Sequence, residues 1–334
     1  MSSHPQRIDV HHHLLPPDFL ADLKRRGVHW TGGSPPVPGW NVSLAREMME
    51  RNGIAVAMTS VIPQVDWGDR AAAAACARMS NEYSARVVND DPEHFGAFAT
   101  LPLPYAADAV RELEYALDEL KLDGVILFAS QGAQYLGDPS YAEVFQELER
   151  RKTVVFIHPN TVPPGAIVPK ISVPWGIVEF PFDTSRAVTN LLFTGALERY
   201  PSIRYIVSHA GGAIPYLALR LALSENLPSW PHENMPKGVL HYLRRLYYDT
   251  ALSTSEQVFA ALREFVPTSQ VLFGSDYPMV PEKVVTIETQ MIEASKVLDD
   301  ETRRAIDREN ALALFPRFAA KTASGETIAQ RAVG

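Results

Sequence analysis

The stretch RIDVHHHLLP at residues 7–16 places three histidines directly after a short apolar run near the start of the chain. The segment RIDV is typical of a buried β-strand, and seven further short, β-rich, apolar runs follow it along the sequence. These runs lie at 54–61, 95–101, 124–128, 154–157, 203–208, 245–249 and 270–274. The chain therefore has eight candidate strands.

Segments with helical periodicity lie between these strands, for example at 106–121, 141–151 and 184–200. Eight strands that alternate with helices predict an α/β fold, specifically a (β/α)8 TIM barrel. No glycine-rich phosphate fingerprint follows the first strand, which argues against a dinucleotide-binding sheet. We expect a single barrel domain over residues 1–318 and a flexible, polar tail over 319–334.

Two connections are too long for ordinary barrel loops, and both follow the carboxyl ends of strands. The first spans residues 14–43 and the second spans 159–183. Active sites of barrels form at that face, so these proline-rich segments are predicted to be pocket walls or lids. A third long connection at 224–238 is expected on the outside or at a subunit contact.

The composition excludes several classes of protein. The chain has 334 residues, 46% of them hydrophobic, and a net charge of −8, with basic residues scattered among acidic ones. This predicts a protein with a sizeable core and no nucleic-acid partner. The absence of a long apolar run and of a signal-peptide pattern predicts no membrane partner and a cytoplasmic location. The single cysteine, Cys76, is expected to be a small buried apolar residue.

Polar side chains stand at the ends of four of the strands, and the ends of parallel barrel strands meet at one rim. Residues two apart on a strand face the same side, so a His-x-His pair points into the barrel mouth while the middle histidine points away. Three imidazoles and a carboxylate suit Zn²⁺ or another borderline divalent metal. The rim residues are His11 and His13 of the first strand, His158 of the fifth, His209 of the sixth and Asp276 of the eighth.

Six motifs in order resemble the amidohydrolase superfamily over nearly the whole chain. They are IDVHHHLLPPDF, VFIHPN, VSHAGGAIPYLALR, YYDTAL, LFGSDYPMVP and ENALALFPR. Together they resemble the decarboxylase branch that includes the aminocarboxymuconate-semialdehyde and γ-resorcylate decarboxylases. The segment LEYALDELKLDGVILFASQGAQYLGDPSY looks most like the 6-methylsalicylate decarboxylase group.

The resemblance implies a ligand set and a reaction. Its metal ligands correspond to His11, His13, His158 and Asp276, with His209 beside the metal. Two-metal relatives use a lysine at the end of the fourth strand, where this chain reads LFASQG, so a mononuclear site is implied. The His-x-His motif of this chain resembles that of the zinc-using members. Zn²⁺ is therefore the preferred cofactor and Mn²⁺ the second choice. A homodimer is also implied.

The implied reaction is non-oxidative decarboxylation of an aromatic carboxylate chelated at the metal and protonated on carbon. The family leaves two routes open: Asp276 delivers the proton while His209 assists, or His209 activates a water bound at the metal. Hydrolysis of a lactone, amide or ester is the alternative reaction, because such a site also activates water. A barrel that serves only as a binding or scaffold protein is a third hypothesis, and the intact set of candidate ligands argues against it.

The substrate is expected to contact aromatic side chains and one arginine. Trp175, Phe180 and Phe182 in the long fifth-strand connection, with Tyr277, are predicted to form a wall for a planar ring. In the muconate-semialdehyde enzyme the counterpart of Arg220 reaches a substrate carboxylate from the neighbouring subunit. A second arginine of that enzyme aligns with Leu44 here, which favours a monocarboxylate such as 6-methylsalicylate.

Overall fold

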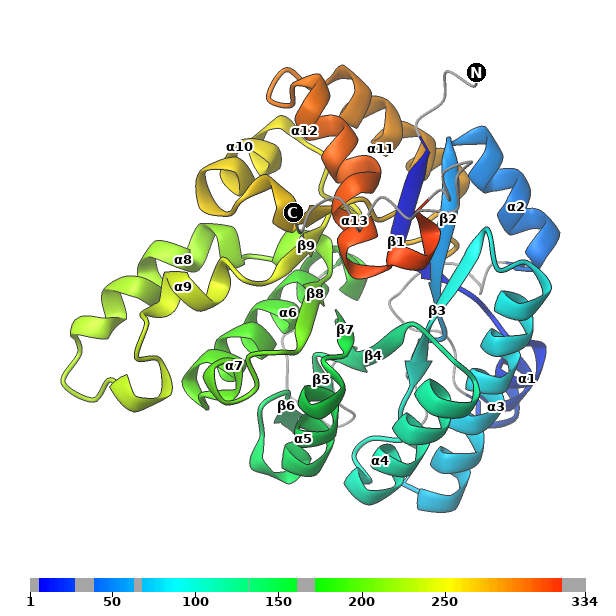
Figure 1. Cartoon of the computed structure of the whole chain (residues 1–334), viewed down its shortest axis with the longest axis horizontal. Helices are drawn as coiled ribbons and strands as arrows, with labels where there is room; N and C mark the ends of the chain where they lie inside the picture. Colours follow the sequence, from blue (N-terminus) through cyan, green and yellow to red (C-terminus); the bar gives the residue numbers. More distant parts are fainter. Residues whose placement is uncertain (1–5, 28–38, 63–67, 132, 161–171, 320–334) are drawn as a thin grey trace, which may run out of the picture.

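The computed structural model describes residues 6–27, 39–62, 68–131, 133–160 and 172–319 (Figure 1). Eight parallel strands follow one another around a barrel in the order β1-β2-β3-β4-β7-β8-β9-β10, and helices surround them. The strands are β1 (Arg7–His13), β2 (Ile54–Ser60), β3 (Phe95–Thr100), β4 (Gly124–Phe128), β7 (Val154–His158), β8 (Arg204–Val207), β9 (Tyr247–Asp249) and β10 (Val271–Leu272). The predicted barrel is confirmed.

Backbone hydrogen bonds close the barrel between its last and first strands. The N–H of Val10 donates to the carbonyl of Phe273 at 2.9 Å, and the N–H of Asp276 donates to the carbonyl of His11 at 2.7 Å. The N–H of His13 completes the seam by donating to the carbonyl of Tyr277 at 2.7 Å. The segment that carries Asp276 is therefore fixed directly against the histidines of β1.

Helices cover the outside of the barrel and alternate with its strands along the chain (Figure 1). Polar N-caps define several starts; for example, the Asp69 carboxylate accepts from the N–H groups of Ala71 and Ala72. The helices are α1 (Pro17–Arg25), α2 (Val42–Arg51), α3 (Arg70–Asp90), α4 (Ala106–Glu114), α5 (Ala142–Arg151), α6 (Trp175–Phe193), α7 (Ala196–Arg199), α8 (Ile214–Leu223), α9 (Val239–Leu243), α10 (Glu256–Phe265), α11 (Glu282–Ala294), α12 (Asp300–Arg304) and α13 (Asn310–Leu314). None of the helices within the described ranges is long and apolar enough to cross a bilayer.

The apolar core lies in two layers. One layer fills the barrel interior with side chains such as Ile8, Val56 and Phe156, and Phe315 after α13 closes this layer from one end. The other layer lies between the strands and the outer helices. Cys76 is buried on α3 in a small apolar cluster with Leu14, as expected.

The two long connections are partly helical, which corrects the sequence prediction. Helix α1 lies within 14–43, and α6 begins at Trp175, well before the predicted end of the second connection at residue 183. Pro181 concealed the helical pattern, since proline usually ends a helix. Here its carbonyl accepts a hydrogen bond from Ser185 Oγ at 2.7 Å, and the helix continues. Residues 28–38 and 161–171 of these connections, and the predicted tail after residue 319, lie outside the described residues.

Several short strands and helical turns lie between these elements. Strands β5 (Ser130–Gln131) and β6 (Gln134–Tyr135) form a small antiparallel hairpin after β4. The short helical turn η1 (Tyr115–Glu119) extends α4, and η4 (Ser224–Asn226) extends α8. A third turn, η3 (His209–Gly211), follows β8. The connection at 224–238 lies with α8 and α9 on a part of the molecule that projects away from the barrel (Figure 1).

Candidate metal centre

Four of the side chains predicted at the rim converge at the mouth of the barrel. His11 and His13 come from β1, His158 ends β7, and Asp276 follows β10. One ligand atom from each lies within 4.8 Å of the others, and all four residues are buried. The structure thus brings together, from three parts of the chain, the set that the sequence placed on one rim.

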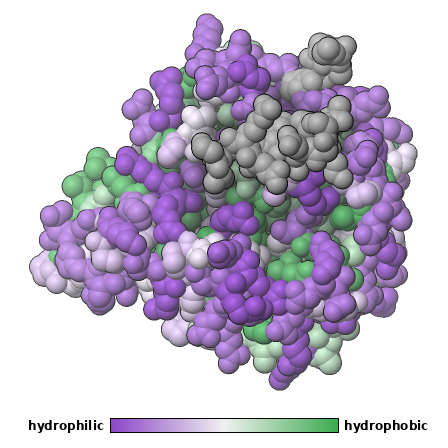
Figure 2. Space-filling view, viewed as in Figure 1, coloured by the Kyte–Doolittle hydropathy of each residue, from purple (hydrophilic) through white to green (hydrophobic). Residues whose placement is uncertain are grey.

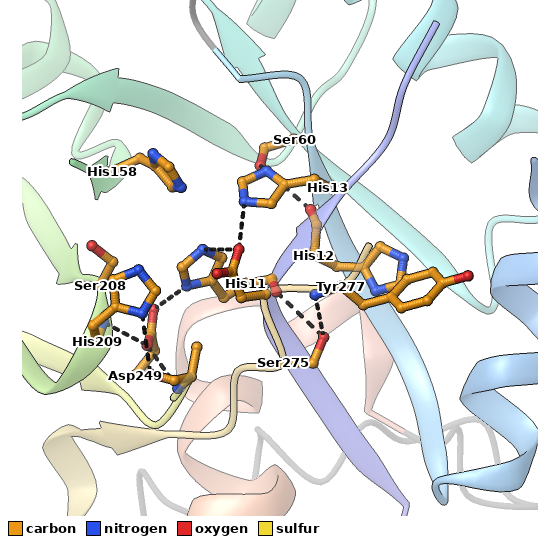
Figure 3. A network of polar contacts seen from close by, with 12 residues as sticks. His11, His12, His13, Ser60, His158, Ser208, His209, Asp249, Ser275 and Tyr277 are labelled. Atoms are coloured by element: carbon orange, nitrogen blue, oxygen red, sulfur yellow. Dashed lines mark hydrogen bonds and ion pairs between the residues drawn. The ribbon is translucent and has the colours of Figure 1, made fainter. Parts of the chain in front are cut away.

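The three histidines present the same ring nitrogen to the centre, because each Nδ1 is already engaged. His11 Nδ1 lies 2.9 Å from Asp249 Oδ2, and His13 Nδ1 lies 3.0 Å from Ser60 Oγ (Figure 3). His158 Nδ1 donates to the carbonyl of Pro159 at 2.8 Å. A histidine whose Nδ1–H donates to an acceptor keeps the Nε2 lone pair for a metal ion.

The atoms that face one another at the centre are buried without hydrogen-bond partners among the described residues. Asp276 Oδ1 lies 3.3 Å from His11 Nε2 and 3.2 Å from His13 Nε2, and none of the three atoms makes a well-aligned hydrogen bond. Buried polar atoms that share one focus and lack partners are typical of a site for a cation. Three imidazole nitrogens and one carboxylate oxygen fit a divalent metal.

The charges at this centre are strongly coupled. Burial lowers the pKa of His11, but the carboxylates of Asp249 and Asp276 outweigh burial and raise that pKa to about 10. Burial lowers the pKa of His13, and it lowers the pKa of His158 well below its ordinary value. Burial opposes ionisation of Asp276, yet the positive charge of His11 holds the pKa of Asp276 well below its usual range. A metal ion would take the place of the proton on His11.

His12, the middle residue of the triplet, points away from the centre. Its Nδ1 lies 3.1 Å from Asp9 Oδ2, and its ring packs against Tyr277 with the centroids 5.3 Å apart (Figure 3). Ser275 Oγ donates to the same Asp9 oxygen at 2.5 Å. His12 therefore belongs to the network that joins β1 to the segment after β10.

His209 lies beside the four converging side chains, with its ring centroid 5.0 Å from that of His11. Its Nδ1 lies 3.1 Å from the carbonyl of Ala251, which leaves Nε2 available. Its backbone N–H donates to Asp249 Oδ1 at 2.9 Å. His209 can therefore act as a base or pass on a proton next to the metal site.

The backbone is strained where the site is built. His209 and Asp276 have positive φ angles of 54° and 58°, which side chains with a Cβ rarely adopt. Gly274 is required for close approach, since a Cβ there would lie 2.9 Å from the Cβ of His11. Strain of this kind is found where surrounding contacts hold functional side chains in place.

Two residues at the site received no role from the sequence. Asp249 ends β9 and Ser60 ends β2, and each contacts the Nδ1 of a converging histidine. The available signal was position, because both are polar residues at the end of a predicted strand. Only the structure shows that Asp249 contacts His11 and that Ser60 contacts His13, each on the ring nitrogen that faces away from the centre.

The predicted aromatic wall is only partly assembled. The Phe180 ring lies 6.3 Å from the His158 ring, centroid to centroid, so it borders the site. Trp175 is half-buried at the start of α6, and Phe182 is 45% exposed. Tyr277 packs on His12, on the other side of the strand from the centre, which argues against its place in this wall. The closure of the barrel places it there, because Tyr277 forms a parallel bridge with His12 of β1.

Arg220 lies on α8 with an exposed side chain, on the part of the molecule that projects away from the barrel (Figure 1). Exposed apolar side chains share this helix: Tyr216 is 89% exposed, Leu219 66% and Leu223 60%. In the space-filling view an apolar patch lies over this projecting region (Figure 2).

Comparison with known proteins identifies the family. A family model described as Amidohydrolase matches residues 8–317. The chain belongs to this amidohydrolase family. Among curated amidohydrolase relatives, the 6-methylsalicylic acid decarboxylase of Penicillium expansum is 36% identical over 320 residues, which cover 93% of this chain and 97% of that protein.

Solved structures agree with the amidohydrolase fold. An amidohydrolase II structure superposes with a TM-score of 0.86 at 29% identity and covers 93% of this chain and 99% of its own. A dihydroxybenzoic acid decarboxylase from a Polaromonas species, solved with manganese and 2-nitroresorcinol, superposes with a TM-score of 0.78 at 20% identity. That comparison covers 94% of this chain and 98% of the other, and at this identity it supports the fold alone.

Proposed function

We propose that the protein is a metal-dependent, non-oxidative decarboxylase of a 2-hydroxybenzoate-type carboxylate, with 6-methylsalicylate as the named substrate. The observation that carries the proposal is the convergence of three histidine Nε2 atoms and a carboxylate oxygen at the barrel mouth. The relative that shares 36% identity over nearly its full length is named for this reaction. We assign the activity to one barrel domain over residues 1–318.

We propose that His11, His13, His158 and Asp276 hold one divalent metal ion per subunit. Three imidazoles and a carboxylate favour Zn²⁺, while the manganese in the Polaromonas structure keeps Mn²⁺ as the second choice. A single ion is favoured because Asp249, which belongs to the other possible ligand group, is already bonded to His11 Nδ1. When bound, the ion supplies Lewis acidity and a template for the substrate carboxylate and its ortho hydroxyl.

The chemistry requires one proton for each CO₂ released. The ring carbon that bears the carboxylate gains a proton, the bond to the carboxylate breaks, and its electron pair returns to the ring. Asp276 stands at the centre and is assigned delivery of this proton to carbon. Asp276 delivers a proton only after it has received one, and His209 is placed to supply it, with its ring centroid 5.0 Å from that of His11.

The substrate ring is assigned to the side of the centre that Phe180 borders. Trp175 and Phe182 belong to the same helix and extend this wall. Arg220 is assigned to the carboxylate of a substrate in the partner subunit, since an arginine binds a carboxylate with two parallel hydrogen bonds.

We further propose a cytoplasmic homodimer. The exposed apolar side chains Tyr216, Leu219 and Leu223 recur at helical spacing on α8, next to Arg220. A contiguous apolar face of this kind is typical of a subunit contact. The lone buried cysteine, Cys76, fits a reducing compartment.

The experiment that tests the function is a measurement of CO₂ release by metal-reconstituted protein. The panel is 6-methylsalicylate, salicylate, γ-resorcylate and 2,3-dihydroxybenzoate, with zinc and manganese forms compared and Asp276→Asn alongside. We expect release from one substrate and at least a 100-fold loss in the variant. Ring opening of lactones with no CO₂ from the panel would instead establish the hydrolase alternative, because the same site can activate water.

A further inference from the structure

Asp249 is a fully buried carboxylate that the proposed reaction does not use. It ends β9, between the strand that leads to His209 and the strand that leads to Asp276. No part of its side chain is exposed. A carboxylate that loses all its water must be compensated by hydrogen bonds or by opposite charge, so its partners indicate its role.

The two oxygens of Asp249 serve two different histidines. Oδ2 lies 2.9 Å from His11 Nδ1, on the ring edge opposite the metal centre. Oδ1 accepts from the backbone N–H of His209 at 2.9 Å and from that of Ala251 at 3.0 Å (Figure 3). The carbonyl of Ala251 in turn lies 3.1 Å from His209 Nδ1.

We propose that Asp249 is a positioning residue that couples the metal ligand His11 to His209. As an acceptor, Asp249 requires the proton of His11 to sit on Nδ1, which leaves the Nε2 lone pair for the metal ion. The same carboxylate holds the backbone of His209, whose φ of 54° needs support. The two rings are thereby kept at a fixed centroid separation of 5.0 Å.

The neighbouring contacts leave Asp249 little freedom to move. The Cα of Gly274 packs against it, since a Cβ at Gly274 would lie 3.2 Å from both Cβ and Cγ of Asp249. The turn of Ala251 is bound to the same carboxylate, so the side chain and the segment that follows it form one unit. A displacement of this unit would move His11 and His209 together.

The test compares Asp249→Asn with Asp307→Asn, a matched substitution of a buried carboxylate. Asp307 bonds to Arg7 Nε at 2.9 Å and does not contact the centre. In Asp249→Asn the amide oxygen can still accept from the backbone of His209, but its NH₂ group would donate to His11 Nδ1 and select the wrong tautomer. We measure the zinc Kd by chelator competition, the number of ions bound, the Tm, and kcat and KM for the active substrate at saturating zinc.

We expect Asp249→Asn to raise the zinc Kd about 10- to 100-fold and to lower kcat even at saturating zinc. Asp307→Asn should lower the Tm and leave the zinc Kd within about twofold, because its role is structural. A zinc Kd for Asp249→Asn within about twofold of the wild-type value would overturn the proposal. So would two ions in the wild-type protein and one in Asp249→Asn, because Asp249 would then be a ligand.

This inference rests on the proposed metal site. The zinc Kd and the CO₂ release distinguish failure of the positioning role from failure of the decarboxylase assignment. If the wild-type protein binds zinc tightly and Asp249→Asn weakens binding while no substrate loses CO₂, the positioning role stands and the decarboxylase assignment fails. If the wild-type protein binds no divalent ion, both fail.

Discussion

Gly274 lies directly against His11: a Cβ on Gly274 would come within 2.9 Å of the Cβ of His11. This distance is shorter than side-chain carbons tolerate, so the last strand can lie this close to the first only with glycine at the position. The geometry of the metal centre therefore depends on a residue that has no side chain.

Gly274→Ala should weaken metal binding at least about tenfold and destabilise the fold by roughly 1 to 3 kcal/mol, because the added carbon overpacks the site. Chelator competition and urea unfolding measure the two effects. Gly39→Ala is the matched control, since a Cβ there meets no atom within 4 Å. An unchanged metal Kd in Gly274→Ala would show that His11 can shift without cost.

Ser60→Ala removes the oxygen that lies 3.0 Å from His13 Nδ1. We expect the metal Kd to rise by about tenfold or less, a smaller effect than that of Asp249→Asn, because a neutral hydroxyl orients a ligand more weakly than a carboxylate. Ser84→Ala, which deletes a buried hydroxyl on α3 that bonds to the Ser80 carbonyl, is the control. An effect larger than that of Asp249→Asn would contradict the account.

Glu288 on α11 predicts a specific dependence of stability on pH. It is 5% exposed, and neither carboxylate oxygen has a hydrogen-bond partner in the described part of the chain. Burial, with the negative charge of Asp276, raises the pKa of Glu288 from 4.5 to about 8. The folded protein therefore holds a proton that the unfolded chain releases, and stability falls as the pH rises from about 4.5 to about 8.

Glu288→Gln should remove this loss. In metal-free protein, the free energy of unfolding of the variant minus that of the wild type should increase by roughly 2 to 5 kcal/mol as the pH rises from about 4.5 to about 8. Glu282→Gln on the same helix is the control: the hydrogen bond from Arg51 lowers the pKa of Glu282, so this residue is ionised in both the folded and the unfolded chain above about pH 5, and the effect of the substitution should stay constant from pH 5 to pH 9. Urea titrations at pH 5, 7 and 9 measure both, and a pH-independent difference for Glu288→Gln would rule out a raised pKa.

Leu219→Glu should separate the proposed dimer into monomers, because it places a charge at the centre of the exposed apolar face of α8. Light scattering after gel filtration should give twice the chain mass of 37.0 kDa for the wild type and 37.0 kDa for the variant. Ile287→Glu, at a 45% exposed position on α11, should remain dimeric. A monomeric wild-type protein would refute the dimer and the role of Arg220 with it.

Much of the fold, and the convergence of His11, His13, His158 and Asp276 at the barrel mouth, was predictable from the sequence. The spacing of the strands predicted the barrel. Each of the seven strands predicted from residue 54 onward contains or overlaps an observed strand. The period of two along a strand separated His11 and His13 from His12. These features depend on local patterns, which a single sequence records.

Other features depend on contacts between distant segments, which local patterns do not record. The proline at 181 hid the start of α6, although the helix runs through this position in the fold. The positive φ of Asp276 and the support of His11 by Asp249 arise only when the last strands close against the first. The position of Tyr277 outside the centre follows from the same closure.

The most direct test of the central claim uses 6-methylsalicylate labelled with ¹³C at the carboxylate, incubated in D₂O with metal-loaded protein. We expect equal amounts of ¹³CO₂ and of 3-methylphenol with one deuterium on the carbon that lost the carboxylate. A chelator should stop the reaction, and zinc or manganese should restore it. Release of ¹³CO₂ that continues in metal-free protein, or none from metal-loaded protein with any member of the panel, would contradict the account.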